Sequence, residues 1–148
     1  MSNLEDDYRE ILLQHARHPK RLGELLDATG KGKCHNPLCG DKISVSIITD
    51  NNKITAIKIQ PSGCSISLAS ASLMTELVEG KSIDEVKNII ESVNINFTPK
   101  VEKSVWPEEL QLLSPLKRIR ENTMKIPCVL ISWIAIKDAL EYCKHSTR

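Results

Sequence analysis

Aromatic residues are scarce in this chain, at 3% of its 148 residues. A protein that binds single-stranded nucleic acid by base stacking needs a platform of aromatic side chains, which this composition does not favour. An excess of either charge is also missing, because 20 basic and 19 acidic residues leave a net charge of +1. Such a balance gives no electrostatic reason to expect nucleic acid or an anionic membrane as a partner.

Long apolar runs, repeats and low-complexity tracts are missing too. No apolar run approaches the length of a membrane span. The polar and acidic beginning, MSNLEDDYRE, does not resemble a signal peptide. We therefore expect a cytoplasmic protein. With 41% hydrophobic residues, residues 1–148 are expected to form one domain with a sizeable core.

The chain does contain five cysteines. An odd number of cysteines, in a chain without a secretory signal, argues against a disulfide framework. In a reducing compartment such as the cytosol, clustered cysteines more often indicate metal or sulfur chemistry. The five are Cys34, Cys39, Cys64, Cys128 and Cys143.

Hydrophobic periodicity predicts an α+β fold, a small antiparallel sheet packed against helices. The first half starts with an amphipathic helix over 6–17. A loop rich in Gly and Lys is expected over 23–33. Alternating apolar residues predict two strands over 42–49 and 54–60, and the Asp50-Asn51-Asn52 segment between them suits a hairpin turn.

The second half is predicted to be helical. A helix over 65–79 is expected to end at Gly80. The Ser82-Ile83-Asp84-Glu85 segment is a capping-box pattern and predicts a helix to about residue 94. In the less regular stretch that follows, Ser114-Pro115 suits the start of a short helix. A last, mostly apolar helix over about 128–142 is expected in the core.

The first candidate for chemistry is Cys39-Gly40-Asp41. If a strand begins here, Cys39 and Asp41 point to the same face. A thiolate and a carboxylate on one face make half of a tetrahedral metal site. The alternative interpretation is a buried thiol beside a capping aspartate.

Two further cysteines, Cys64 and Cys128, each lie at the beginning of a predicted helix. The helix dipole favours the thiolate there, which is the form that binds metal and attacks sulfur. Cys64 could instead be a small residue chosen for packing. With the Cys39 and Asp41 pair, the set has three sulfurs and one oxygen, complete for zinc or partial for an iron–sulfur cluster. No spacing rule requires the three segments to meet in space, so the metal site stays open at this point.

Several motifs resemble the iron–sulfur cluster assembly proteins of the IscU/SufU/NifU N-terminal type. The similarity covers almost the whole chain, including the helix exit around Gln14-His15. It implies an IscU/NifU-N-like α+β scaffold that binds zinc or a nascent cluster through Cys39, Asp41, Cys64 and Cys128. The motifs are HNPLCGD at 35–41, GCSIS at 63–67 with ASAS at 69–72, and EGKS at 79–82.

Two features place the chain nearer the SufU branch. Pro127 stands where the scaffold branch typically has a histidine, and the segment between Trp106 and Met124 resembles an insertion of the SufU branch. The resemblance implies a zinc-bound sulfur acceptor that works with a cysteine desulfurase, rather than a stand-alone turnover enzyme. Lys125 stands where that branch usually has an arginine, so it keeps the charge without the bidentate fork.

We therefore expect a protein that accepts persulfide sulfur from a cysteine desulfurase and passes it to cluster-assembly or acceptor proteins. Three thiolates and one carboxylate on zinc leave a formal charge of minus two, which Lys125 or Lys42 would offset. Cys39 is the expected sulfur acceptor because it lies on a loop, and Cys128 is the second choice. Two alternatives stay open, a scaffold for a [2Fe–2S] cluster on the same residues and a zinc site that only staples the fold.

The remaining candidates are expected to have no part in the chemistry. Cys34 with His35 is expected in a loop, as a free thiol, and Cys143 is expected to be a spare surface cysteine. His15 falls on the apolar face of the first helix and is interpreted as a packing residue, while His18 and His145 have no companions. The basic cluster Lys117, Arg118 and Arg120 is expected to be a solvated helix face, with docking to an acidic partner as its alternative.

Overall fold

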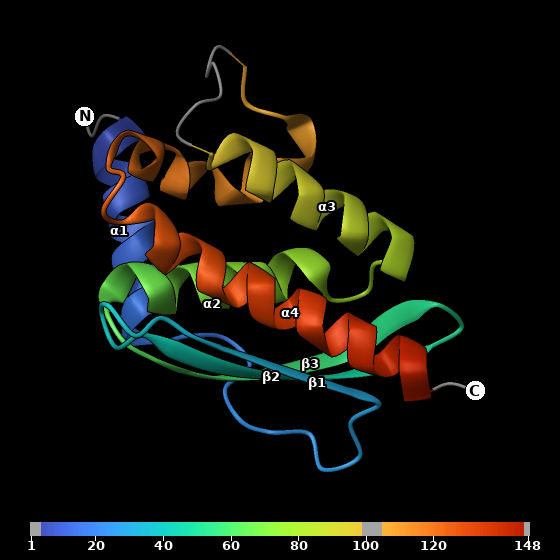
Figure 1. Cartoon of the computed structure of the whole chain (residues 1–148). Coiled ribbons are helices and arrows are strands. Elements are labelled where there is room, and N and C mark those ends of the chain that lie inside the picture. Colours follow the sequence, from blue (N-terminus) through green and yellow to red (C-terminus); the bar gives the residue numbers. More distant parts are fainter. Residues whose placement is uncertain (1–3, 99–104, 147–148) are drawn as a thin grey trace.

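The structure, a computed structural model, describes residues 4–98 and 105–146, with side chains up to residue 141. A three-stranded antiparallel sheet of order β1-β2-β3 carries the helices on one face (Figure 1). This arrangement confirms the predicted α+β class. Within the described ranges, no helix combines the length and the hydropathy needed to cross a membrane. In chain order the elements are α1 (Leu4–Arg17), β1 (Gly30–His35), β2 (Lys42–Asp50), β3 (Lys53–Ser62), α2 (Ser65–Val78), α3 (Ile83–Asn96), the 3₁₀ helix η1 (Glu108–Glu121) and α4 (Ile126–Ser146).

The β2–β3 hairpin forms where the sequence predicts it. Asn51 and Asn52 have φ values of 51° and 63°, the left-handed conformation that a tight hairpin turn requires and that asparagine tolerates. In register, Val45 lies opposite Ile59 and Ile47 opposite Ile57. These four side chains are buried against the helices, so the hairpin supplies the floor of the core.

The predicted loop over 23–33 is wrong from Gly30 onward, because Gly30–His35 forms β1 and pairs with β2. The strand has few residues with a preference for strands, since its sequence is GKGKCH. It is held instead by α4, which lies directly over it. A Cβ at Gly32 would collide with the Ala135 carbonyl oxygen and lie 2.5 Å from the Ala139 nitrogen. Glycine is what lets helix and strand approach this closely.

Both outer edges of the sheet are covered near their middle. On the β1 edge, the Lys33 amide donates to the Asp138 carboxylate of α4 (3.2 Å). On the β3 edge, the Ile59 amide donates to the Arg21 carbonyl and the Ile59 carbonyl accepts from the Gly23 amide, both at 2.9 Å. Pro61, also in β3, has no amide hydrogen to offer.

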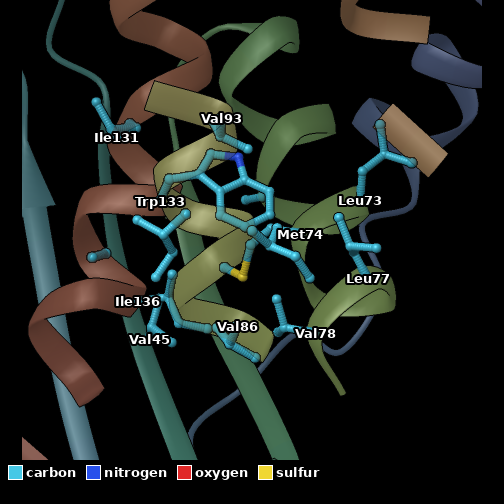
Figure 2. Close-up of a cluster of buried hydrophobic side chains, with 14 of the residues drawn as sticks. Val45, Leu73, Met74, Leu77, Val78, Val86, Val93, Ile131, Trp133 and Ile136 are labelled. Atoms are coloured by element: carbon cyan, nitrogen blue, oxygen red, sulfur yellow. The ribbon is translucent and has the colours of Figure 1, made fainter. Parts of the chain in front are cut away.

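The core is a single cluster between the sheet and the helices. Trp133 of α4 lies at its centre and is fully buried (Figure 2). Its ring is surrounded by side chains from α2, α3 and α4 (Figure 2). The last helix therefore belongs to the core as predicted, although it begins at Ile126, two residues before Cys128.

The capping box at the start of α3 is confirmed. The Glu85 amide donates to Ser82 Oγ and the Ser82 amide donates to Glu85 Oε1, both at 3.1 Å. The predicted helix start at Ser114-Pro115 is wrong, because both residues lie buried in the middle of η1. Leu110, Leu113 and Leu116 are spaced by three, and side chains at this spacing line up in a 3₁₀ helix. All three are fully buried, so this spacing gives η1 its apolar face.

The basic cluster in η1 is only partly the solvated face expected. Arg120 is buried, and its guanidinium lies 4.9 Å from the centroid of the Trp106 ring, which also has Lys117 Nζ at 5.5 Å. Cation–π contact explains why the Lys117 and Arg120 side chains face the Trp106 ring instead of solvent. Arg118 is exposed and pairs with Glu5 of α1 at 2.9 Å.

Candidate metal centre

The four residues predicted as ligands come together where three segments meet, the turn before β2, the start of α2 and the first turn of α4. One ligand atom from each of Cys39, Asp41 and Cys128 lies within 4.8 Å of the other two. Cys64 joins this group through Asp41, because its Sγ donates to Asp41 Oδ2 at 3.5 Å.

The turn that presents Cys39 is closed by its own hydrogen bonds. The Gly40 amide donates to the Asn36 carbonyl, and the Asn36 amide donates to the Asp41 carbonyl, both at 2.8 Å. Because β2 begins only at Lys42, strand alternation is the wrong reason for the pairing of Cys39 with Asp41. The turn pairs them instead, with Gly40 at a φ of 77°.

Asp41 is held in a buried position by the segment that precedes α2. Its carboxylate accepts from the Cys64 amide at 2.9 Å, and the residue is 1% exposed. A Cβ at Gly63 would collide with this carboxylate, and Gly63 has a φ of 148°. Gly63 is thus a site residue that the sequence reasoning noticed only as the neighbour of Cys64.

Both remaining cysteines lie at helix beginnings, which confirms the prediction. Cys64 is the N-cap residue of α2, with no capping bond from its own side chain. Ser67 Oγ donates to the Cys64 carbonyl at 2.9 Å and lies 3.7 Å from the Cys64 sulfur. Cys128 lies in the first turn of α4, and its amide donates to the Lys125 carbonyl at 3.0 Å.

The three thiols differ in exposure. Cys39 is exposed, Cys64 is half-buried and Cys128 is 2% exposed. Burial, followed by hydrogen bonds to Asp41 and Cys64, raises the pKa of Cys128 well above the ordinary thiol range. Burial alone would raise the pKa of Asp41, but hydrogen bonds from the Cys64 amide and from the three thiols lower it below its usual value. Without a metal, the site therefore keeps a carboxylate surrounded by thiols.

This donor set fits a tetrahedral divalent metal. Ligands at about 2.3 Å for sulfur and about 2.0 Å for oxygen are separated by roughly 3.5–3.8 Å around zinc. The Asp41–Cys64 separation of 3.5 Å lies in this range, and Cys39, Asp41 and Cys128 offer ligand atoms within 4.8 Å of one another. Three sulfurs and one oxygen also match the ligand preference of zinc. A metal can therefore bind here with small side-chain movements.

The other candidates from the sequence lie elsewhere. His15 is the packing residue expected, with Nδ1 2.7 Å from Ser72 Oγ. Cys34 is a free thiol, as expected, but it lies in β1 rather than in a loop. Burial raises its pKa. Lys125 and Lys42 are exposed. The side chains of Cys143 and His145 lie outside the described residues.

Solved structures share this fold. A nitrogen-fixing NifU-like protein (N-terminal) from Brucella abortus aligns with a TM-score of 0.85 at 18% identity, over 99% of this chain and 100% of that one. A putative iron–sulfur cluster assembly scaffold protein for the SUF system from Fervidobacterium islandicum aligns with a TM-score of 0.77 at 23% identity, over 93% of this chain and 99% of that one.

Sequence relatives cover nearly the whole chain. The zinc-dependent sulfurtransferase SufU of Bacillus subtilis is 29% identical over 94% of this chain and 92% of its own length. The iron–sulfur cluster assembly scaffold protein IscU of Streptococcus pyogenes is 31% identical over 95% of this chain and 87% of its own. The model of the NifU-like N terminal domain matches residues 7–105. Since that match spans more than half of the chain, the protein belongs to the family of NifU-like N-terminal domains.

Proposed function

We propose that this protein accepts sulfur from a cysteine desulfurase at a zinc-bound cysteine and passes it on for iron–sulfur cluster assembly. The observation that carries the proposal is the exposure of Cys39 beside a buried Asp41 and a buried Cys128. An exposed thiolate can meet a partner's persulfide, which a buried one cannot. The similarity to a zinc-dependent sulfurtransferase and to cluster assembly scaffold proteins supports the same setting.

Cys39, Asp41, Cys64 and Cys128 are the ligands in this proposal. Bound zinc would hold the cysteines as thiolates and protect them from oxidation. Burial raises the pKa of the Cys128 thiol, so its ionisation would depend on the metal. Lys125 is exposed next to the start of α4, and we assign it the supporting role of offsetting the formal charge of minus two.

The sulfur transfer itself is a thiol exchange at Cys39. The Cys39 thiolate attacks the terminal sulfur of the partner's cysteine persulfide. A sulfur–sulfur bond forms at Cys39 while the partner's sulfur–sulfur bond breaks, and the partner cysteine leaves as a thiolate. The proton stays on the transferred sulfur, so the products are a Cys39 persulfide and a reduced partner cysteine. No external oxidant or reductant is needed.

Mass spectrometry after incubation with a cysteine desulfurase and cysteine tests the proposal. We expect one added sulfur on the peptide that contains Cys39, and no uptake by the Cys39→Ser variant. Cys34→Ser is the matched control, because Cys34 is a free thiol outside the ligand group. Sulfur on the Cys128 peptide would overturn the assignment of the acceptor, and unchanged uptake by Cys39→Ser would overturn the mechanism.

Metal content is the second test. We expect about one divalent metal per chain in protein purified without added metal, because three sulfurs and one oxygen form a complete tetrahedral set. Elemental analysis of the wild type and of Cys64→Ser measures this, and the variant should lose most of the metal. Freshly purified protein that holds neither zinc nor iron would contradict the proposal.

A scaffold for a [2Fe–2S] cluster on the same residues is the second candidate. The observation in its favour is the 31% identity with a scaffold protein named IscU. Anaerobic reconstitution with iron and sulfide, followed by absorption spectroscopy, separates the two functions. A stable cluster bound in place of zinc would favour the scaffold, and failure to form one would favour the sulfur acceptor.

A further inference from the structure

The face of the sheet that carries no helix has an unusual composition. The described helices all lie on the opposite face (Figure 1). Strand alternation and register place nine side chains on the helix-free face in three cross-strand rows. The rows are Lys31–Ser46–Lys58, Lys33–Ser44–Gln60 and His35–Lys42–Ser62. We call these nine residues the basic face.

The basic face carries charge of one sign. Four of its residues are lysines, one is a histidine and none is acidic. The chain has 20 basic and 19 acidic residues, so 16 basic residues stand against 19 acidic ones elsewhere. A chain that is nearly neutral as a whole therefore concentrates positive charge on one sheet face.

Most of the basic face is open to solvent. The segment between α1 and β1 crosses only its first row, where the Leu25 amide donates to Ser46 Oγ at 3.0 Å. All residues of the second and third rows are exposed. Two acidic residues lie at its rim, Glu24, which pairs with Lys31 at 3.4 Å, and Asp138, which is bonded to the Lys33 amide. Among the described residues, no carboxylate lies within 4.0 Å of the ammonium group of Lys33 or Lys42.

A groove of about 300 Å³ runs beside these rows. Its walls include the segment at Gly23 and Glu24, and its floor includes second-row residues. Its lining contains Glu24, Lys31, Lys33, Ser44, Gln60 and Asp138.

We propose that the basic face docks an acidic segment of a partner protein. Lysine ammonium groups pair with carboxylates, and the serine and glutamine side chains between them supply hydrogen-bond partners. Nucleic acid is disfavoured as the occupant, because the face has neither arginine for bidentate phosphate contacts nor an aromatic ring for stacking. The inference does not depend on which metal the site binds.

The basic face lies next to the candidate metal centre. The third row contains His35 and Lys42, which flank the turn that presents Cys39 and Asp41. A partner that binds the basic face is therefore brought to the rim of the metal centre. Steering by opposite charge also raises the rate of such encounters, most strongly at low salt.

Fluorescence anisotropy with a labelled oligoglutamate peptide tests the proposal on the full chain. We expect binding that weakens as salt is added. The double variant Lys33→Glu/Lys58→Glu, at an exposed and a half-exposed position of the basic face, should weaken it by about tenfold or more, since each charge pair contributes up to about 1 kcal/mol. The matched control is Lys87→Glu/Lys137→Glu, which makes the same charge change on exposed positions of α3 and α4 and should retain at least half of the affinity.

Equal weakening by the two double variants would overturn the proposal, because only net charge would then matter. Tighter binding of an oligothymidylate of equal length, lost in the same variant, would make the face a nucleic-acid surface instead. Metal content and thermal unfolding report whether each variant is folded. If Lys33→Glu/Lys58→Glu does not fold, the wild type is titrated with the peptide and followed by amide NMR. The proposal requires the largest changes in amide chemical shift to fall on the basic face, and changes elsewhere would overturn it. Sulfur uptake is measured in a separate experiment, so failure of peptide docking can be distinguished from failure of the proposed function.

Discussion

At the scale of single residues, the Asp41 carboxylate connects the segments of the candidate metal centre. One of its oxygens accepts from the Cys64 amide, and the other lies 3.5 Å from the Cys64 sulfur. The amide bond fixes the carboxylate, so the second oxygen is presented to the thiols. Its lowered pKa keeps it ionised at neutral pH. Among the four candidate ligands, its carboxylate is the hardest donor.

Replacing Asp41 tests this role. Asp41→Ala leaves three cysteines and an open coordination position, which admits water or an outside thiol. We expect metal release to a chelator to accelerate by about tenfold or more, as ligand-shell changes commonly do. Asp50→Ala, at the exposed hairpin, is the control and should release metal at the wild-type rate. If Asp41→Ala also releases metal at the wild-type rate, Asp41 is not a ligand.

Gly63 is the second residue whose identity the site requires. A Cβ there would collide with the Asp41 carboxylate, so Gly63→Ala should weaken metal binding as well as stability. Gly80→Ala is a matched control, because Gly80 also has a positive φ, 87°, but no atom lies within 4 Å of its added Cβ. Both variants should lose about 1–2 kcal/mol of unfolding free energy from the backbone conformation. Only Gly63→Ala should also lose metal affinity, as competition with a chelator would measure, and equal affinities would refute the positioning role.

At the scale of elements, local signals predicted more than long-range ones. The hairpin of β2 and β3 and the capping box of α3 depend on residues close in sequence, and both were predictable. β1 was not, because its residues have little strand preference and its pairing depends on α4, a hundred residues later. The four candidate ligands were singled out by residue type and by resemblance, whereas their meeting in space depends on tertiary packing that no spacing rule encodes.

Gly32 offers a direct test of the packing of α4 on β1. The added Cβ of Gly32→Ala would meet the backbone of α4, which cannot rotate away as a side chain can. We expect a loss of about 1–3 kcal/mol, the usual cost of overpacking. Chemical denaturation measures it, with Lys31→Ala on the exposed face as the control. A change below about 0.5 kcal/mol, the range of ordinary surface substitutions, would show that α4 and β1 adjust freely.

At the scale of the whole molecule, His15, which lies on α1 and contacts Ser72 of α2, links folding to protonation. Burial lowers the pKa of His15, Glu76 opposes that effect and Lys20 adds to it. The folded state therefore binds this proton less readily than the unfolded chain. The stability that His15 contributes is present above its ordinary pKa of 6.5 and is lost as the pH falls through the lowered value.

Removing that proton site should flatten the pH profile. His15→Gln is expected to lose less stability than the wild type when the pH falls from about 7 to about 5. Urea denaturation at each pH measures this, with both proteins stripped of metal so that ligand protonation does not contribute. His18→Gln, on an exposed residue, is the control and should follow the wild type. Parallel profiles for His15→Gln and the wild type would show that His15 does not titrate with folding.

The covered edges of the sheet have a consequence for how this protein can be recognised. Asp138 occupies the edge of β1, and the chain around Arg21 and Gly23 occupies that of β3. A free edge invites an extended peptide, or a second copy of the chain, to add a strand through main-chain bonds that ignore sequence. With both edges engaged, a visiting chain must be distinguished by its side chains. A protein with an exposed cysteine such as Cys39 is thereby protected from association that ignores side chains.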